Sequence, residues 1–387
     1  MTGVLPDDAV DALLVGRVWD PATGGPRPVG VRDDAVVDLF DAAPTVSRLL
    51  ETPAADVAAA VAAGPARWDL DEILEASERR RGDAPHLLAP VDLQAVKACG
   101  VTFAGSMVER VIEERCGGDP ARAAQVRAEV DDALGGVDIG RIVPGSDDAA
   151  RVKEVLQQRG LWSQYLEVGI GPDPEVFTKA PVLASVGYGM RVGVPEFSTW
   201  NNPEPELVLV VDSRGRARGA TLGNDVNLRD VEGRSALLLG MAKDNNASSA
   251  LGPFVRLFDD RFTAADAAAM RISLRVEGTD GFVLDDVNDV ARLSRTFERL
   301  IAAAHGEHHQ YPDGFVLYTG TLFTPTQDRG DPGLGFTHRS GDVVTISSPQ
   351  LGTLANEVAP TGTLSPWEFG IGALVDYLDR CRSAARA

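Results

Sequence analysis

Short stretches of alternating apolar and polar residues make up most of the chain, and helical spacing is confined to a few segments. Residues 8–40 predict short strands separated by turns. Residues 45–81 instead place apolar residues three and four apart among helix formers, and a stretch containing Gly and Pro follows at 82–92. The pattern therefore predicts a small N-terminal α+β domain, residues 1–92, and a larger domain, residues 93–387.

The larger part is expected to be mostly strands, with helices near its two ends. Helical segments are predicted at 106–115 and 120–134, and a last helix at 366–384. From about residue 160 the chain alternates between apolar runs and turns rich in Gly, Pro and Asp. Three β-hairpins are predicted in this part, at 206–223, 274–286 and 341–356.

Two glutamates stand one residue apart where the apolar run of the stretch "NNPEPELVLV" begins. Glu204 and Glu206 share a face if this segment is a strand, and two neighbouring carboxylates raise each other's pKa. A divalent cation would remove that conflict, and the hairpin returns to Asp225 as a third carboxylate. Oxygen ligands without His or Cys favour Mg²⁺, with Mn²⁺ or Ca²⁺ as alternatives. The simpler interpretation is an exposed strand face that carries both glutamates.

Charge and composition narrow the classes of partner. The chain has 57 acidic and 37 basic side chains and a formal net charge of −20, which argues against a nucleic-acid or anionic-membrane partner. Its three cysteines are far apart, so neither a zinc site nor a disulfide framework is expected. The first residues lack the pattern of a signal peptide, and no apolar run is long enough to span a membrane. We therefore expect a cytoplasmic protein.

The stretch "NNPEPELVLVVDSRGRARGATLGNDVNLRD" resembles the metal-binding core of the fumarylacetoacetate hydrolase superfamily, in which an ExE pair, a hairpin and an N-D-x-x-x-R-D segment follow one another. The resemblance covers roughly residues 96–358 and is closest to the longer subgroup associated with sugar-acid dehydration. It implies an α+β, β-rich roll around a metal ion, with a small N-terminal domain, in a homodimer. Further segments that match in order are 175–187, 242–253, 318–325 and 341–358.

The resemblance also implies roles for individual residues. Glu204, Glu206 and Asp225 become the metal ligands, and Lys243 becomes the active-site lysine. A lysine buried beside a metal is expected to have a lowered pKa, so Lys243 could serve as the base at C3 or stabilise an enolate. The substrate-binding residues implied by the family motifs are Gly320, Thr321 and Arg229.

Family substrates are 2-oxo acids, whose carboxylate and 2-oxo oxygen chelate Mg²⁺, so that enolate chemistry follows. Hydrolases of the family carry a His with a Glu three residues later, and here Ser106 and Glu109 stand at those positions. A serine cannot act as a near-neutral base, so dehydration of a 2-keto-3-deoxy sugar acid, such as a pentonate, is favoured. Ser106 and Glu109 also fit a helix capping box, which needs no catalytic role.

Other activities remain open at this stage. An acylpyruvate-type hydrolase that cleaves a C–C bond could take its base from elsewhere in the chain. A family member that only binds its ligand is a third interpretation. Isomerase, decarboxylase or cyclisation chemistry would use the same enolate.

Overall fold

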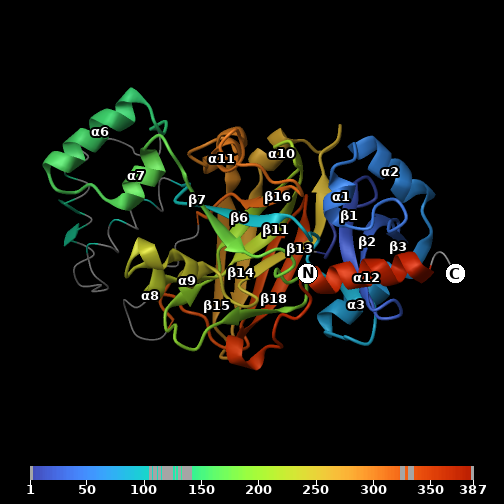
Figure 1. Ribbon diagram of the computed structural model, residues 1–387. Helices are drawn as coiled ribbons and strands as arrows, with labels where there is room; N and C mark the ends of the chain where they lie inside the picture. Colours follow the sequence, from blue (N-terminus) through green and yellow to red (C-terminus); the bar gives the residue numbers. More distant parts are fainter. Residues whose placement is uncertain are drawn as a thin grey trace.

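The computed structural model describes residues 3–103, 142–322, 327–329 and 335–384, together with single residues between 107 and 132. Its centre is formed by β-sheets (Figure 1). The predicted β-rich α+β class is confirmed.

The main sheet combines strands from the N-terminal segment with strands from as far along the chain as residue 318. It contains β1 (Leu14–Asp20), β2 (Gly25–Arg32), β3 (Ala35–Asp38), β4 (Ala66–Asp69), β5 (His86–Leu87), β6 (Ala95–Gly100), β7 (Glu175–Ala180), β10 (Pro205–Val211), β11 (Ala217–Asp225), β13 (Ser249–Leu257) and β16 (Phe315–Tyr318). The strand order is β4-β3-β2-β1-β13-β11-β10-β16-β6-β7, with β5 paired to β1. Only β16 and β6 run parallel among these pairs.

A second sheet covers one face of the first. It contains β8 (Arg191–Val194), β14 (Arg271–Glu277), β15 (Val283–Asp289), β17 (Val343–Ser348) and β18 (Gly352–Pro360), in the order β15-β14-β17-β18-β8. A short ribbon pairs β9 (Asn201–Asn202) with β12 (Asn227–Leu228).

Helices lie around these sheets. They are α1 (Val46–Leu50), α2 (Ala54–Ala63), α3 (Leu70–Glu78), α6 (Asp147–Gln158), α7 (Gln164–Ile170), α8 (Arg229–Glu232), α9 (Leu239–Lys243), α10 (Ala264–Ala268), α11 (Phe297–Ala304) and α12 (Ile371–Ala384), with 3₁₀ turns η3 (Ala236–Leu238), η4 (Val290–Arg292) and η5 (Thr361–Thr363). None of the helices in the described ranges is long and apolar enough to cross a membrane.

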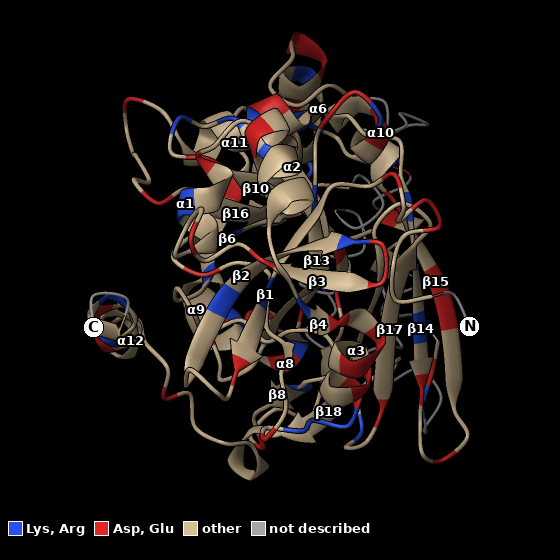
Figure 2. Cartoon of the chain, turned by 90° about the vertical axis from the view of Figure 1, so that its right-hand side faces the viewer, with Lys and Arg blue, Asp and Glu red and all other residues tan. Residues whose placement is uncertain are grey.

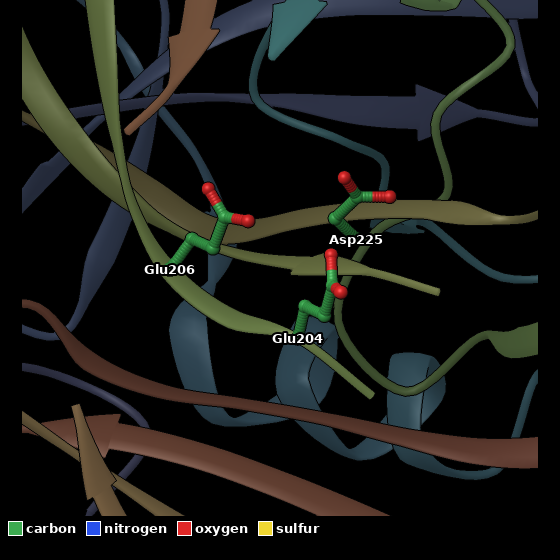
Figure 3. A group of neighbouring side chains, drawn as sticks. All are labelled: Glu204, Glu206 and Asp225. Atoms are coloured by element: carbon green, nitrogen blue, oxygen red, sulfur yellow. The ribbon is translucent and has the colours of Figure 1, made fainter. Parts of the chain in front are cut away.

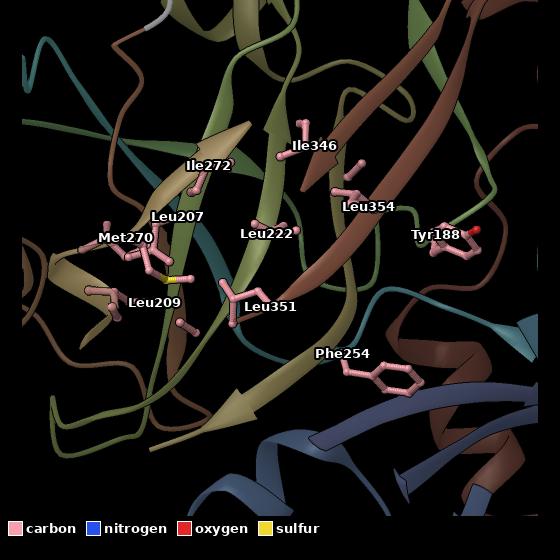
Figure 4. Close-up of a cluster of buried hydrophobic side chains, with 14 of the residues drawn as sticks. Tyr188, Leu207, Leu209, Leu222, Phe254, Met270, Ile272, Ile346, Leu351 and Leu354 are labelled. Atoms are coloured by element: carbon pink, nitrogen blue, oxygen red, sulfur yellow. The ribbon is translucent and has the colours of Figure 1, made fainter. Parts of the chain in front are cut away.

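Hydrophobic burial explains the two kinds of strand pattern. Every residue of β10 is buried, because Leu207 and Leu209 join the core between the two sheets, whereas Val208 and Val210 join a second cluster on the other face. Strand β14, in contrast, alternates between exposed and buried residues, as expected for a strand with one face in water. Figure 4 shows the core between the sheets, with Leu207, Leu209, Leu222, Ile272, Ile346 and Leu354 among its labelled side chains.

Acidic and basic residues are interspersed on the outer surface. Across β14 and β15, Arg271 lies opposite Asp289 and Arg275 lies opposite Asp285. Figure 2 shows basic segments on β14 beside acidic segments on β15. Such pairing places opposite charges next to each other across the two strands.

The predicted division near residue 92 does not coincide with a break in the main sheet. Strand β1 pairs with β13 in antiparallel register, with Val15 opposite Val255. Helix α12 also returns to this end of the molecule (Figure 1), where Tyr377 lies so close to Gly25 that a Cβ there would come within 2.3 Å of the ring. The domain boundary therefore stays a prediction, although the sheet itself crosses it.

The three predicted hairpins are confirmed as β10–β11, β14–β15 and β17–β18. The predicted last helix begins later than expected, at Ile371. In the segment before this helix, Phe369 packs edge-on against Trp19 of β1. Helix α7 was not predicted; the Ser163 side chain caps it by accepting a hydrogen bond from the Leu166 amide. The helices predicted at 106–115 and 120–134 lie largely outside the described residues.

We expect Leu222→Ala to lower the free energy of unfolding by about 2–5 kcal/mol, because it opens a cavity between the two sheets. Leu222 is completely buried. Val283→Ala is the matched control, since Val283 is 40% exposed and its truncation opens no cavity. Urea unfolding measures both, and equal losses of stability would contradict this account of the core.

Candidate active site

The hairpin register brings three carboxylates together at one end of the main sheet. Strand β10 begins at Pro205, and Glu204 and Glu206 are the residues directly before and after this proline. Pro205 lies opposite Asn224 in β11, so the next residue, Asp225, lies beside Glu204, and its amide donates to the Glu204 carbonyl at 3.1 Å. One carboxylate oxygen from each of Glu204, Glu206 and Asp225 lies within 4.8 Å of the other two (Figure 3).

These carboxylates are buried, which makes their mutual repulsion costly. Glu204 is 5% exposed, and Glu206 and Asp225 are 1% exposed. Burial, together with the charges of Asp225 and Glu204, holds the pKa of Glu206 well above its ordinary value. An arrangement of three buried oxygen donors without a nitrogen or sulfur ligand fits Mg²⁺ or a similar hard cation. The interpretation as an exposed strand face is therefore wrong.

Lys243 contacts two of the carboxylates directly. Its Nζ donates to Glu204 Oε2 at 2.5 Å and to Asp225 Oδ2 at 3.1 Å. Burial by itself would lower the pKa of Lys243, but the charges of Asp225 and Glu204 outweigh it and raise the pKa above its ordinary value. A lowered pKa is expected for a lysine beside a metal ion, whose charge would offset the two carboxylates, so that expectation stays a prediction. Without a cation at the site, the two carboxylates hold Lys243 as the charged ammonium.

A second lysine, which we did not predict as a site residue, contacts the other carboxylate oxygen of Asp225. Lys179 on β7 is fully buried, and its Nζ lies 2.7 Å from Asp225 Oδ1. The same ammonium donates to the backbone carbonyls of Lys243 at 2.5 Å and Val226 at 3.0 Å, and to Ser248 Oγ at 3.2 Å. The only sequence signal was its place in the F-x-K stretch at 177–179.

The predicted Gly-Thr loop lies against Glu206. The Gly320 amide donates to Glu206 Oε2 at 2.6 Å. Gly320 has a φ of +98°, and a Cβ there would lie 1.9 Å from Thr102 Oγ1, so this position requires glycine. Asn288 Nδ2 fixes the loop by donating to the carbonyls of Pro205 at 2.8 Å and Gly320 at 3.3 Å. The loop therefore positions a candidate metal ligand, and the contact of Thr321 with a substrate stays a prediction.

The remaining predicted site residues are Arg229, Ser106 and Glu109. Arg229 is largely buried at the start of α8, with its guanidinium 4.4 Å from the centre of the Trp200 ring. Its role in binding substrate is not tested by this geometry. Ser106 and Glu109 lie outside the described residues, so their roles also stay predictions.

Comparison with known proteins agrees with the geometry. Residues 150–359, more than half of the chain, match the family model for the fumarylacetoacetate (FAA) hydrolase C-terminal region. A probable 2-keto-3-deoxyxylonate dehydratase of Haloferax volcanii is 32% identical over 202 residues, which are 52% of this chain and 66% of that protein. A 2-dehydro-3-deoxy-D-arabinonate dehydratase of Saccharolobus solfataricus is 30% identical over 185 residues, 48% of this chain and 58% of that protein.

A solved structure extends the likeness beyond the matched sequence. A 2-keto-3-deoxy-D-arabinonate dehydratase complexed with magnesium and 2,5-dioxopentanoate superimposes with a TM-score of 0.62 over 90% of this chain and 99% of that chain. At 21% identity the likeness is one of fold. The sequence matches themselves cover less than two thirds of the length of each curated relative. On the family match and the shared fold, the chain belongs to the fumarylacetoacetate hydrolase family.

Proposed function

We propose that the protein is a divalent-metal-dependent dehydratase (hydro-lyase) that removes water from a 2-keto-3-deoxy sugar acid, a pentonate in the first instance. The observation that carries the proposal is the buried set of Glu204, Glu206 and Asp225, with Lys243 donating to two of its members. The names of the two curated relatives support the substrate class.

The three carboxylates would hold Mg²⁺, with Mn²⁺ or Ca²⁺ as alternatives. Such an ion supplies Lewis-acid polarisation of a bound 2-oxo group and stabilises the negative charge that develops when C3 loses a proton. The residues fit the ion by charge as well as by ligand type. Three carboxylates face two ammonium groups, Lys243 and Lys179, so a divalent cation would convert a net negative cluster into one that attracts an anionic substrate.

The overall reaction breaks a C3–H bond and the C4–O bond and releases one water. A pentonate would be left with a C3–C4 double bond and a hydroxyl on C5, and its tautomerisation would give an aldehyde at C5. Lys243, whose Nζ lies beside Glu204 and Asp225, is proposed either to remove the C3 proton or to stabilise the enolate oxygen. Glu109 is proposed as an acid or base near C3 and C4, with Ser106 beside it. Thr321 and Arg229 are proposed to bind the substrate carboxylate.

Lys179 is proposed to fix the position of Asp225. By contacting Asp225 Oδ1 it leaves Oδ2 facing Lys243, and by binding the Lys243 carbonyl it also restrains the backbone that carries the active-site lysine. Removing one partner of a buried pair leaves the other charge uncompensated. We therefore expect the loss of Lys179 both to destabilise the fold and to displace Asp225 and Lys243.

We further propose that the enzyme acts as a homodimer in the cytoplasm, as the family resemblance implies. Light scattering of the purified protein measures the assembly state, and the mass of a monomer would contradict the dimer.

The activity is tested by mass spectrometry of the purified protein with Mg²⁺ and two separate substrates, a 2-keto-3-deoxypentonate and an acylpyruvate. We expect the first to lose one water and the second to remain unchanged. Release of pyruvate from the acylpyruvate would instead assign the protein to the C–C hydrolases.

Metal binding is tested with Glu206→Gln, which removes one charged ligand from the cluster. We expect affinity for Mn²⁺, followed by electron paramagnetic resonance, to fall by more than about 100-fold, since loss of a partner outside the ligand shell already costs about 10–100-fold. Glu357→Gln is the control, because Glu357 is a carboxylate paired with Arg80 and Arg191 away from the triad. Unchanged Mn²⁺ affinity in Glu206→Gln would overturn the metal assignment.

Lys179→Met is expected to lower the free energy of unfolding by about 3–5 kcal/mol, because it leaves Asp225 buried with one fewer cationic partner. Arg275→Met is the control, since Arg275 pairs with Asp285 on the exposed face of β14 and surface pairs contribute little. Urea unfolding in the absence of divalent metal compares them. Similar small losses for both variants would show that Lys179 does not hold the site together.

A further inference from the structure

Two asparagines border the carboxylate triad on the ribbon formed by β9 and β12. Asn202 lies directly opposite Asn227 in this antiparallel pair. Residues at opposite positions have their side chains on the same face. Asn227 shows which face this is, because its Nδ2 donates to Glu204 Oε1 at 3.1 Å and to Glu232 Oε2 at 2.6 Å. Both asparagine side chains therefore lie on the side of the triad, and both are buried, with exposures of 2% and 0%.

The hydrogen bonds fix the orientation of both amides. Asn202 Nδ2 donates to the Pro203 carbonyl at 2.9 Å, and Asn227 Nδ2 donates to two carboxylates. Carbonyl and carboxylate oxygens only accept, so the amide nitrogens must face them. Asn202 Oδ1 and Asn227 Oδ1 are then left buried without a hydrogen-bond partner among the described residues. Because an unpaired buried acceptor is costly, two of them on one face indicate a donor that a ligand brings.

The chemistry of the substrate decides which ligand group can be that donor. The carboxylate and the 2-oxo oxygen of a 2-oxo acid only accept hydrogen bonds, and so do the carbonyl oxygens of a diketo acid in its keto form. A hydroxyl group donates. A hydroxylated sugar acid therefore matches these two acceptors, whereas a diketo acid does not.

We propose that Asn202 and Asn227 form a hydroxyl-binding subsite, which selects 2-oxo acids that carry a hydroxyl beyond the 2-oxo group. The inference rests on the proposed function, in which the 2-oxo group of the substrate would lie at a cation held by Glu204, Glu206 and Asp225. It assigns the discrimination between sugar acids and diketo acids to two uncharged side chains beside the triad.

The test measures binding of two unreactive ligands by calorimetry at saturating Mg²⁺. N-(2-hydroxyethyl)oxamate and N-ethyloxamate share a carboxylate and an adjacent carbonyl, and they differ by one terminal hydroxyl; neither can lose water. We expect the unaltered protein to bind the hydroxylated ligand at least about 10-fold more tightly, since sites with buried polar groups reject analogues that leave those groups unpaired. In Asn202→Leu the two affinities should agree within about twofold, through weaker binding of the hydroxylated ligand alone.

Asn201→Leu is the matched control. Asn201 is the neighbouring residue on the same strand, is 3% exposed, and points its Nδ2 at Ser198 Oγ, 3.2 Å away. Its Oδ1 is also buried without a partner among the described residues, so it differs from Asn202 in the face on which it lies. Adjacent residues of a strand face opposite sides, so this variant should retain the preference for the hydroxylated ligand. Asn202→Ala replaces Asn202→Leu if the leucine variant does not fold.

Four results would overturn the proposal. The unaltered protein could bind both oxamates equally, or Asn202→Leu could keep the preference. Equal weakening of both ligands in Asn202→Leu would assign the amide oxygens to metal-bound water. If neither oxamate binds, the assignment of a 2-oxo acid substrate fails together with the subsite. A hydroxyl preference without dehydration of a 2-keto-3-deoxypentonate would instead refute the proposed reaction and leave the subsite standing.

Discussion

The structure depends on how three buried negative charges are kept together. Glu204, Glu206 and Asp225 lie at the end of a hairpin in which every residue of β10 and the last seven residues of β11 are buried. Such burial is strongly unfavourable for uncompensated carboxylates. Two lysines from other elements, Lys243 and Lys179, supply part of the compensation. Three carboxylates facing two ammonium groups leave one negative charge in excess, which is the physical reason to expect a divalent cation.

The surrounding fold makes this arrangement rigid. The Gly320 amide, held by Asn288, fixes Glu206, and the Asp225 amide binds the Glu204 carbonyl. Each ligand is thus restrained through the backbone of a neighbouring strand or loop. A site that is built before the ion arrives loses little conformational freedom on binding. The same restraint would hold a 2-oxo acid in one orientation, with its far end towards Asn202 and Asn227.

Much of this arrangement could be predicted from the sequence, because it follows from local patterns. Turn residues and alternation predicted the three hairpins, and the hairpin after Glu206 brought Asp225 back beside Glu204. Contacts between distant segments could not be predicted in this way. Lys179 reaches Asp225 from a strand 46 residues earlier in the chain, and Lys243 meets Glu204 across 39 residues of sequence. The short helix α7 depends on a single serine cap and gives too short a pattern to distinguish it from a loop.

The most direct test of the central claim is the effect of Mg²⁺ on the thermal unfolding of the protein and of Glu204→Gln. An ion that binds only the folded state raises the unfolding temperature in proportion to the logarithm of its concentration above the dissociation constant. The account predicts a rise for the unaltered protein and none for Glu204→Gln over the same concentrations. Equal rises in both would mean that Mg²⁺ binds elsewhere and that the buried carboxylates are held together by the two lysines alone.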